Sequence, residues 1–138
     1  MNRDPQADAL LRLFAALSDA TRLRLLNLMD GREVCVCYFV EILEQSQPKI
    51  SRHLAYLRNA GIVTARREGK WMHYRMERPV SSEIAAILDA TLRSFKVNRA
   101  MQQDLARLDM ACCEPLGLVA LQGAPPPTGF AQMSGNGQ

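Results

Sequence analysis

The stretch Ser46-Gln47-Pro48-Lys49-Ile50-Ser51-Arg52-His53-Leu54 decides the fold, because it has the pattern of a helix that reads DNA. Ser46 is a natural N-cap, and Pro48 is tolerated in a first helical turn, where amide hydrogens have no partner within the helix. Glutamine can pair with adenine and arginine with guanine, while lysine, serine and histidine suit phosphates or base edges. This predicted helix ends at Ala60-Gly61, and the side chains available to DNA are Gln47, Lys49, Ser51, Arg52, His53 and Arg58.

Three further helices are predicted before this one. Apolar residues spaced i, i+3, i+4 and i+7 predict an amphipathic helix over about residues 5–17. Ser18 or Asp19 is expected to cap a second helix, which stops at Asp30-Gly31, where glycine supplies a left-handed residue. A short helix over roughly residues 37–44 then leads into the turn before Ser46.

A β-hairpin and a long helix are expected to follow. Residues 62–66 and 71–76 are rich in β-favouring side chains around a Gly-containing loop, 67–70, which predicts a two-stranded wing. Ser81 or Ser82 is expected to cap a helix whose apolar stripe reaches Phe95 and can continue to Leu108. This order predicts a mainly α fold with a small β-hairpin, a winged helix-turn-helix. The wing adds three expected DNA contacts, Arg67, Lys70 and His73.

Composition separates a folded part from a tail and concentrates positive charge in one place. From Gly117 the sequence shifts to Gly, Pro, Gln and Ser, so we expect one domain over residues 1–113 and a flexible, largely disordered tail over 114–138. Residues 49–75 hold seven basic side chains against Glu68 alone, while the whole chain has a net charge of +3. The positive charge therefore lies where a polyanion such as double-stranded DNA can use it.

Other broad classes fit the sequence less well. No apolar segment follows a basic start, and no run of about 18 apolar residues occurs, so we expect a cytoplasmic protein without membrane contact. Four cysteines in that compartment suit ligation or redox chemistry better than a disulfide framework. The sequence contains neither Cys-x-x-Cys nor a Gly-rich phosphate-binding loop, and it does not predict an enzyme.

The segments Glu33-Val34-Cys35-Val36-Cys37, 45–54 and 69–75 resemble those of the arsenic-responsive repressors of the ArsR/SmtB family. The resemblance runs from about Leu10 to Leu108 and leaves the tail from Glu114 outside it. It implies a homodimeric winged-helix repressor, joined through its first and last helices, that needs no cofactor to bind its DNA operator. It also implies that trivalent arsenic or antimony, As(III) or Sb(III), is the inducer that releases the repressor.

Four cysteines are the candidate ligands for this inducer. Cys35 and Cys37 supply two thiolates, and trivalent arsenic and antimony prefer three sulfur ligands. The resemblance implies a third cysteine three residues after the second, but Val40 occupies that position. The third ligand then comes from Cys112 or Cys113, comes from an external thiol, or is missing. The adjacent Cys112-Cys113 pair is alternatively a separate site for soft metals or organic arsenicals, or a pair of tail thiols without function.

The spacing of the first two thiols suggests how an ion acts on the DNA-reading helix. Positions i and i+2 of a helix lie about 200° apart and cannot both face one ion. A chelate between Cys35 and Cys37 is therefore expected to distort the start of the short helix and to shift residues 47–52 relative to the DNA groove. Release also requires that the ion binds the DNA-incompetent conformation more tightly.

Two apolar stripes are longer than one core of this size can cover, which predicts a homodimer with a helix-to-helix seam. The residues expected in the seam are Leu10, Leu13, Phe14, Ile87, Leu88 and Leu92.

The sequence leaves open inducing signals other than arsenic and antimony. Cadmium or lead can bind Cys35, Cys37 and a tail thiol, and either cysteine pair can act as a thiol redox sensor. A structural zinc site made of all four cysteines lacks the usual two-residue spacer. The resemblance implies that zinc, nickel or cobalt sensors place histidine and carboxylate ligands on the last helix, and residues 81–110 contain no histidine.

Overall fold

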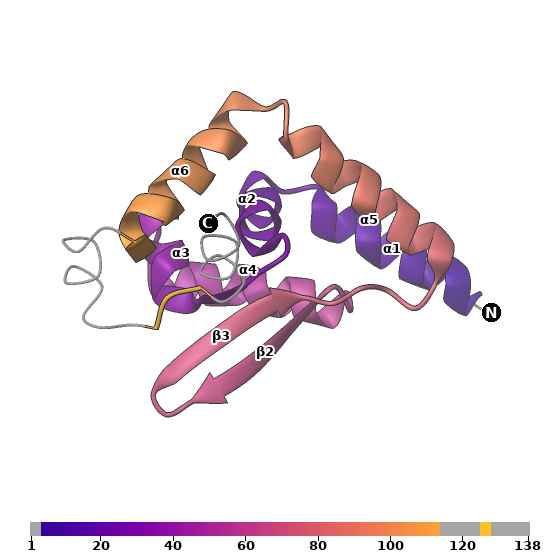
Figure 1. Ribbon diagram of the computed structural model, residues 1–138. Coiled ribbons are helices and arrows are strands. Elements are labelled where there is room, and N and C mark those ends of the chain that lie inside the picture. Colours follow the sequence, from indigo (N-terminus) through magenta and orange to yellow (C-terminus); the bar gives the residue numbers. More distant parts are fainter. Residues whose placement is uncertain (1–3, 114–124, 128–138) are drawn as a thin grey trace.

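The structure, a computed structural model, describes residues 4–113 and 125–127. Helices make up most of this part of the chain, and a small sheet projects from them (Figure 1). It is the winged helix-turn-helix that the sequence predicts. The elements follow the order α1 (Pro5–Leu17), α2 (Ala20–Met29), β1 (Glu33–Cys35), α3 (Val36–Leu43), α4 (Gln47–Asn59), β2 (Val63–Glu68), β3 (Trp71–Met76), α5 (Ser82–Phe95) and α6 (Arg99–Cys113).

The helix starts follow local hydrogen-bonding rules. Asp19, Ser46 and Ser81 each accept a hydrogen bond from the backbone N–H three residues further along. Such caps satisfy amide hydrogens that have no partner within the helix. The cap at Ser46 is confirmed, and the structure selects Asp19 over Ser18 and Ser81 over Ser82.

The helix-turn-helix is built from α3 and α4. The chain reverses at Glu44, which adopts a left-handed φ of 54° and donates its N–H to the carbonyl of Val40 at 3.0 Å. Both helices then bury their apolar faces in a common core, as expected for α4, so the opposite face of α4 is left to solvent. The side chains buried there are Tyr38, Phe39, Ile42, Leu43, Ile50, Leu54 and Leu57.

The sheet has three strands where a two-stranded hairpin was expected. β3 pairs antiparallel with both β1 and β2, which gives the order β1-β3-β2. Glu68 pairs with Trp71, so Gly69 and Lys70 form a two-residue turn, and Gly69 has the positive φ, +58°, that such turns require. The hairpin is confirmed. The strand β1 was missed because three residues carry too little pattern, and only their pairing with a distant strand defines them.

The C-terminal helical region is two helices instead of one. The side chain of Asn98 accepts a hydrogen bond from the N–H of Met101 and begins α6, which folds back across α2 and α3 (Figure 1). Arg24 on α2 forms two hydrogen bonds with Asp104, and Asn27 donates to the carbonyl of Met101. The reversal was missed because the helical spacing of apolar residues continues through both helices.

Most of the predicted tail, residues 114–124 and 128–138, lies outside the described residues. Pro125–Pro127 are described, have no regular secondary structure, and include a buried side chain at Pro127. Within the described ranges, the helices lack the combination of length and apolar composition that crossing a bilayer requires.

Candidate DNA-binding surface and thiol site

Two thiols meet where β1 passes into α3. Cys35 is the last residue of β1 and the N-cap of α3, and Cys37 lies in the first helical turn. The two sulfur atoms are 3.5 Å apart, with the thiol of Cys37 donating to Cys35. The expectation that both thiols lie on one helix, on opposite sides, is wrong because Cys35 precedes the helix. Both sulfur atoms can therefore face one ion without unwinding α3.

The two thiols share one proton. The hydrogen bond from Cys37 lowers the pKa of Cys35 to about 6 against the opposing effect of burial, with support from the backbone N–H groups at the helix start and from nearby His73. The same hydrogen bond, together with burial, raises the pKa of Cys37 above its ordinary value. Near neutral pH, Cys35 is therefore a thiolate and Cys37 a thiol.

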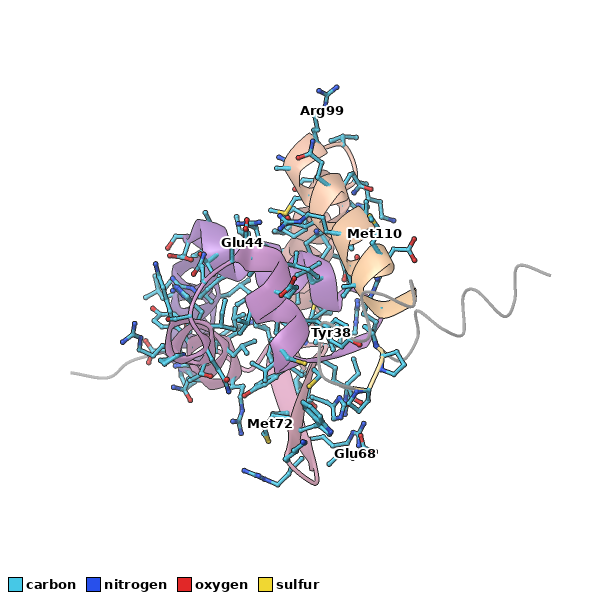
Figure 2. All side chains as sticks on the ribbon, turned by 90° about the vertical axis from the view of Figure 1, so that its left-hand side faces the viewer. Tyr38, Glu44, Glu68, Met72, Arg99 and Met110 are labelled. Carbon is cyan, nitrogen blue, oxygen red and sulfur yellow. The ribbon has the colours of Figure 1, made fainter. Side chains whose placement is uncertain are left out.

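Among the described side chains, the pair is not joined by a third candidate metal ligand. Across residues 4–112, the described side chains of His, Cys, Asp and Glu form no cluster of three or more that could hold a metal ion. Figure 2 shows α6 running from Arg99 past Met110 toward the first turn of α3, which is marked by Tyr38. Cys112 near the end of α6 is buried, and it is close enough to Arg32, just before β1, to contribute to the electrostatic environment of that side chain. The side chain of Cys113 lies outside the described structure.

The added strand β1 covers part of the wing. His73 on β3 lies opposite Cys35, is 3% exposed, and has its Nε2 2.8 Å from Oε1 of Glu68. The structure therefore buries His73 beside Glu68 and does not present this side chain to DNA in the way the sequence predicts. Arg66 on β2 binds Glu33 on β1 at 2.6 Å and lowers the pKa of that carboxyl. This ion pair, which sequence reasoning missed, joins the two outer strands beside the thiols.

Polar and basic side chains on α4 and on the wing face solvent. Lys49 and Arg52 extend from the face of α4 opposite the core. Ser51 is half-buried. On the wing, the Nζ atom of Lys70 lies 4.9 Å from the centre of the Trp71 ring. The exposed side chains at predicted DNA contacts are Gln47, Lys49, Arg52, Arg58, Arg67 and Lys70.

His53 points away from this exposed face, toward the junction of α1 and α2. Its side chain is 17% exposed, and Nδ1 lies 3.3 Å from Nη1 of Arg22 and 3.8 Å from Oδ1 of Asp19. Burial lowers the pKa of His53, the Asp19 carboxylate opposes that effect, and the neighbouring cations Arg22, Lys49 and Arg52 add to it. The structure thus gives His53 an internal partner in place of the predicted DNA contact, because the long side chain of Arg22 reaches it from α2.

The expected dimer seam is partly internal to one chain. Phe14 is 50% exposed, whereas Leu10 and Ile87 are half-buried. Leu11, which the stripe analysis did not select, is 65% exposed and lines an open cavity of about 320 Å³ between α1 and α4. The remaining expected residues are buried in the core of a single chain and cannot form an exposed seam: Leu13, Leu88 and Leu92.

Comparisons with known proteins agree with this architecture. A family model described as bacterial regulatory protein, arsR family, matches residues 19–65. The chain is 42% identical over 99 residues to the arsenical resistance operon repressor of Escherichia coli (strain K12), covering 70% of this chain and 85% of that protein. It is 48% identical over 77 residues to the arsenic resistance transcriptional regulator ArsR1 of Pseudomonas putida, covering 55% and 60%. Among solved structures, HlyU from Vibrio cholerae N16961 superposes with a TM-score of 0.57 at 29% identity, covering 68% of this chain and 99% of that one.

Proposed function

Because this chain belongs to the arsR family of bacterial regulatory proteins, we propose that it is a homodimeric repressor that leaves its operator when trivalent arsenic or antimony binds Cys35 and Cys37. As a member of this family, the protein is a DNA-binding transcriptional regulator and not an enzyme. One observation carries the choice of inducer: two sulfur atoms lie 3.5 Å apart, and one of them is a thiolate near neutral pH. Sulfur ligands without competing nitrogen or oxygen favour thiophilic ions.

Arsenite or antimonite binds both sulfur atoms by losing two of its hydroxyl groups, one of which leaves as water with the proton that Cys37 now holds. Its third ligand comes from an external thiol, or from Cys112 or Cys113 after the end of α6 moves toward the pair. Two relatives named for arsenic resistance support arsenic as the inducer. DNA binding itself requires no cofactor in this proposal.

The location of the pair couples ion binding to DNA release. Cys35 lies opposite His73 in the wing, and Cys37 lies in α3, the helix before α4. An ion at this junction removes the hydrogen bond between the thiols and changes the charge next to both DNA-contacting elements. By linkage, DNA weakens ion binding by the same factor as the ion weakens DNA binding, typically about 1–3 kcal/mol.

Fluorescence anisotropy on the DNA duplex directly upstream of the gene tests the proposal. We expect the protein to bind this duplex, and we expect arsenite and antimonite to release it at the lowest concentrations among a series that includes cadmium, lead and zinc. Release by cadmium or lead below the arsenite concentration would assign the inducer to those ions instead. Zinc is expected to fail because it usually takes four ligands, and the described residues place no further His, Cys, Asp or Glu with the two thiols to complete such a set.

The sulfur separation of 3.5 Å also supports a second candidate function, thiol redox sensing. An oxidant such as diamide would take two electrons from Cys35 and Cys37, one proton from Cys37 and one from water, forming one S–S bond while its own N=N bond is reduced to N–N. Release by diamide in preference to arsenite would favour this function, and mass spectrometry of the peptide containing both cysteines would detect the lost pair of hydrogens.

The proposal also includes homodimer formation and action in the cytoplasm. A dimer presents two α4 helices to a palindromic operator, and the exposed Leu11 and Phe14 of α1 are candidate contacts between the two chains. A regulator that binds bacterial DNA acts in the cytoplasm.

A further inference from the structure

Arg22 on α2 reaches both the end of α1 and one side of α4. Its Nε donates to the carbonyl of Ala16 at 2.9 Å, and its Nη2 donates to the carbonyl of Ala15 at 3.0 Å. Carbonyls in the last turn of a helix lack N–H partners within that helix, and a cation is favourable there. On its other side, Nη1 lies 3.3 Å from Nδ1 of His53, and the guanidinium carbon lies 4.2 Å from the centre of the Tyr56 ring.

We propose that Arg22 is a positioning residue for DNA recognition, which fixes the rotation of α4 relative to α1 through His53 and Tyr56. The inference rests on the proposed DNA binding by α4. His53 and Tyr56 are three residues apart and therefore neighbours on one side of the helix. A contact with both restricts the rotation of α4 about its axis and its movement along that axis.

Apolar packing alone leaves this rotation less well defined. The core face of α4 consists of Ile50, Leu54 and Leu57, whose hydrophobic contacts have no preferred direction. Hydrogen bonds weaken steeply when their angle departs from linear. Arg52 directly precedes His53, so a rotation that breaks the Arg22 contact also turns Arg52 away from its place toward the DNA groove.

The contact with Arg22 requires a neutral imidazole, because a guanidinium nitrogen can only donate. Asp19 faces His53 at 3.8 Å and favours its protonation, whereas Arg22, Lys49 and Arg52 disfavour it. Burial is the largest influence, and together with these cations it lowers the pKa of His53, so the folded state binds this proton less readily than the unfolded state does. The contribution of His53 to stability is therefore complete above its ordinary pKa and falls as the pH decreases below it.

This requirement gives the pH dependence of DNA binding a distinctive sign. A histidine that contacted phosphate would strengthen DNA binding when protonated, because it would add positive charge. A histidine that holds Arg22 weakens DNA binding when protonated, because Nδ1 then becomes a donor and the contact is lost. The sign of the change on acidification therefore distinguishes the two roles of His53.

The experiment measures affinity for the upstream duplex over a range of salt at about pH 7.5 and about pH 5.5, on either side of the ordinary histidine pKa. The variants are Arg22→Met, which removes every guanidinium contact, and Arg22→Lys, which keeps the charge. His53→Gln keeps a hydrogen-bond acceptor that does not titrate. Lys49→Ala is the control for loss of a phosphate contact, and Arg93→Met on α5 is the control for loss of an exposed charge.

We expect Arg22→Met and Arg22→Lys to weaken DNA binding by roughly tenfold with an unchanged salt dependence. Lys49→Ala should instead reduce the slope of affinity against salt by about one unit, and Arg93→Met should resemble the wild type. The wild type should bind more weakly at the lower pH, and His53→Gln should lose that difference. If Arg22→Met does not fold, as judged by circular dichroism, Arg22→Lys and His53→Gln decide the question.

Three results would overturn the inference. Arg22→Lys with wild-type affinity would show that the charge alone suffices. A reduced salt slope in Arg22→Met would make Arg22 a phosphate contact, and stronger wild-type binding at the lower pH that His53→Gln abolishes would make His53 a DNA contact. Absence of any wild-type binding would refute the proposed function instead. NMR titration of the His53 ring in the free protein tests the contact with Arg22 without DNA. The pKa of His53 should lie below its ordinary value in the wild type and should change in Arg22→Lys.

Discussion

Serine in place of Cys35 or Cys37 removes one sulfur ligand and changes the side-chain volume little. We expect each variant to bind DNA as the wild type does and to stay bound when arsenite is added, because a neutral hydroxyl does not replace a thiolate. Cys112→Ser tests the candidate third ligand separately: it should keep DNA binding and weaken the arsenite response less than loss of Cys35 or Cys37, since Cys112 lies outside the 3.5 Å pair. Release of the double variant Cys35→Ser, Cys37→Ser at wild-type arsenite concentrations would refute the proposed site.

The hydrogen bond between the thiols predicts an unusual titration. The pKa of Cys35 is lowered from 9.0 to about 6, so the ultraviolet absorbance of one thiolate should appear as the pH rises through 6. Because the pKa of Cys35 is lowered in the folded state, its own contribution to stability is complete above pH 9 and is lost as the pH falls through about 6, whereas the raised pKa of Cys37 acts against stability as the pH rises above 9. In Cys37→Ala the donor is gone, and the inflection should move toward higher pH. An inflection that stays near 6 in this variant would contradict the assigned cause.

At the scale of elements, α6 is held on α2 by the ion pair between Arg24 and Asp104. The distances are 2.7 and 2.9 Å, and the Asp104 side chain is 4% exposed. We expect Asp104→Ala to lower the free energy of unfolding by roughly 1–3 kcal/mol, measured with urea, because Arg24 is left without its partner. Arg107→Ala breaks the exposed pair with Glu44 and should cost less than about 0.5 kcal/mol. Equal effects of the two substitutions would contradict the importance of burial.

Elements whose pattern is local were predictable from the sequence. The helix caps at Asp19, Ser46 and Ser81 and the buried face of α4 follow from residues within a few positions of each other. The strand β1 depends on pairing with β3, whose residues lie 38 to 42 positions further along the chain. The reversal at Asn98 depends on the packing of α6 against α2. Local spacing contains neither kind of information.

The same distinction explains which site residues were placed correctly. Cys35 and Cys37 are two positions apart, and their grouping was visible in the sequence. His73 lies opposite Cys35 of the missed strand β1 and contacts Glu68, and His53 contacts the long side chain of Arg22, 31 positions away. Histidine suits DNA contacts and internal hydrogen bonds equally well, so its residue type could not decide between them.

At the scale of the whole molecule, the exposed apolar side chains of α1 are expected to lie between two copies of the chain. Leu11→Glu and Phe14→Glu should produce monomers in analytical ultracentrifugation and weaken operator binding, because each monomer carries only one α4. Val97→Glu, between α5 and α6, replaces a more exposed apolar residue and serves as the control that should remain dimeric. Dimers of normal stability in both α1 variants would place the seam elsewhere.

The thiol pair occupies the short segment between β1 and α3, whereas any third donor has to come from another part of the chain or from solution. Natural selection can therefore change which toxic element the protein detects without changing which operator it binds. A substitution at Val40 or near the end of α6 changes the donor set of the ion without replacing any exposed side chain of α4. A lineage can in this way acquire a response to a new element while it keeps the same operators.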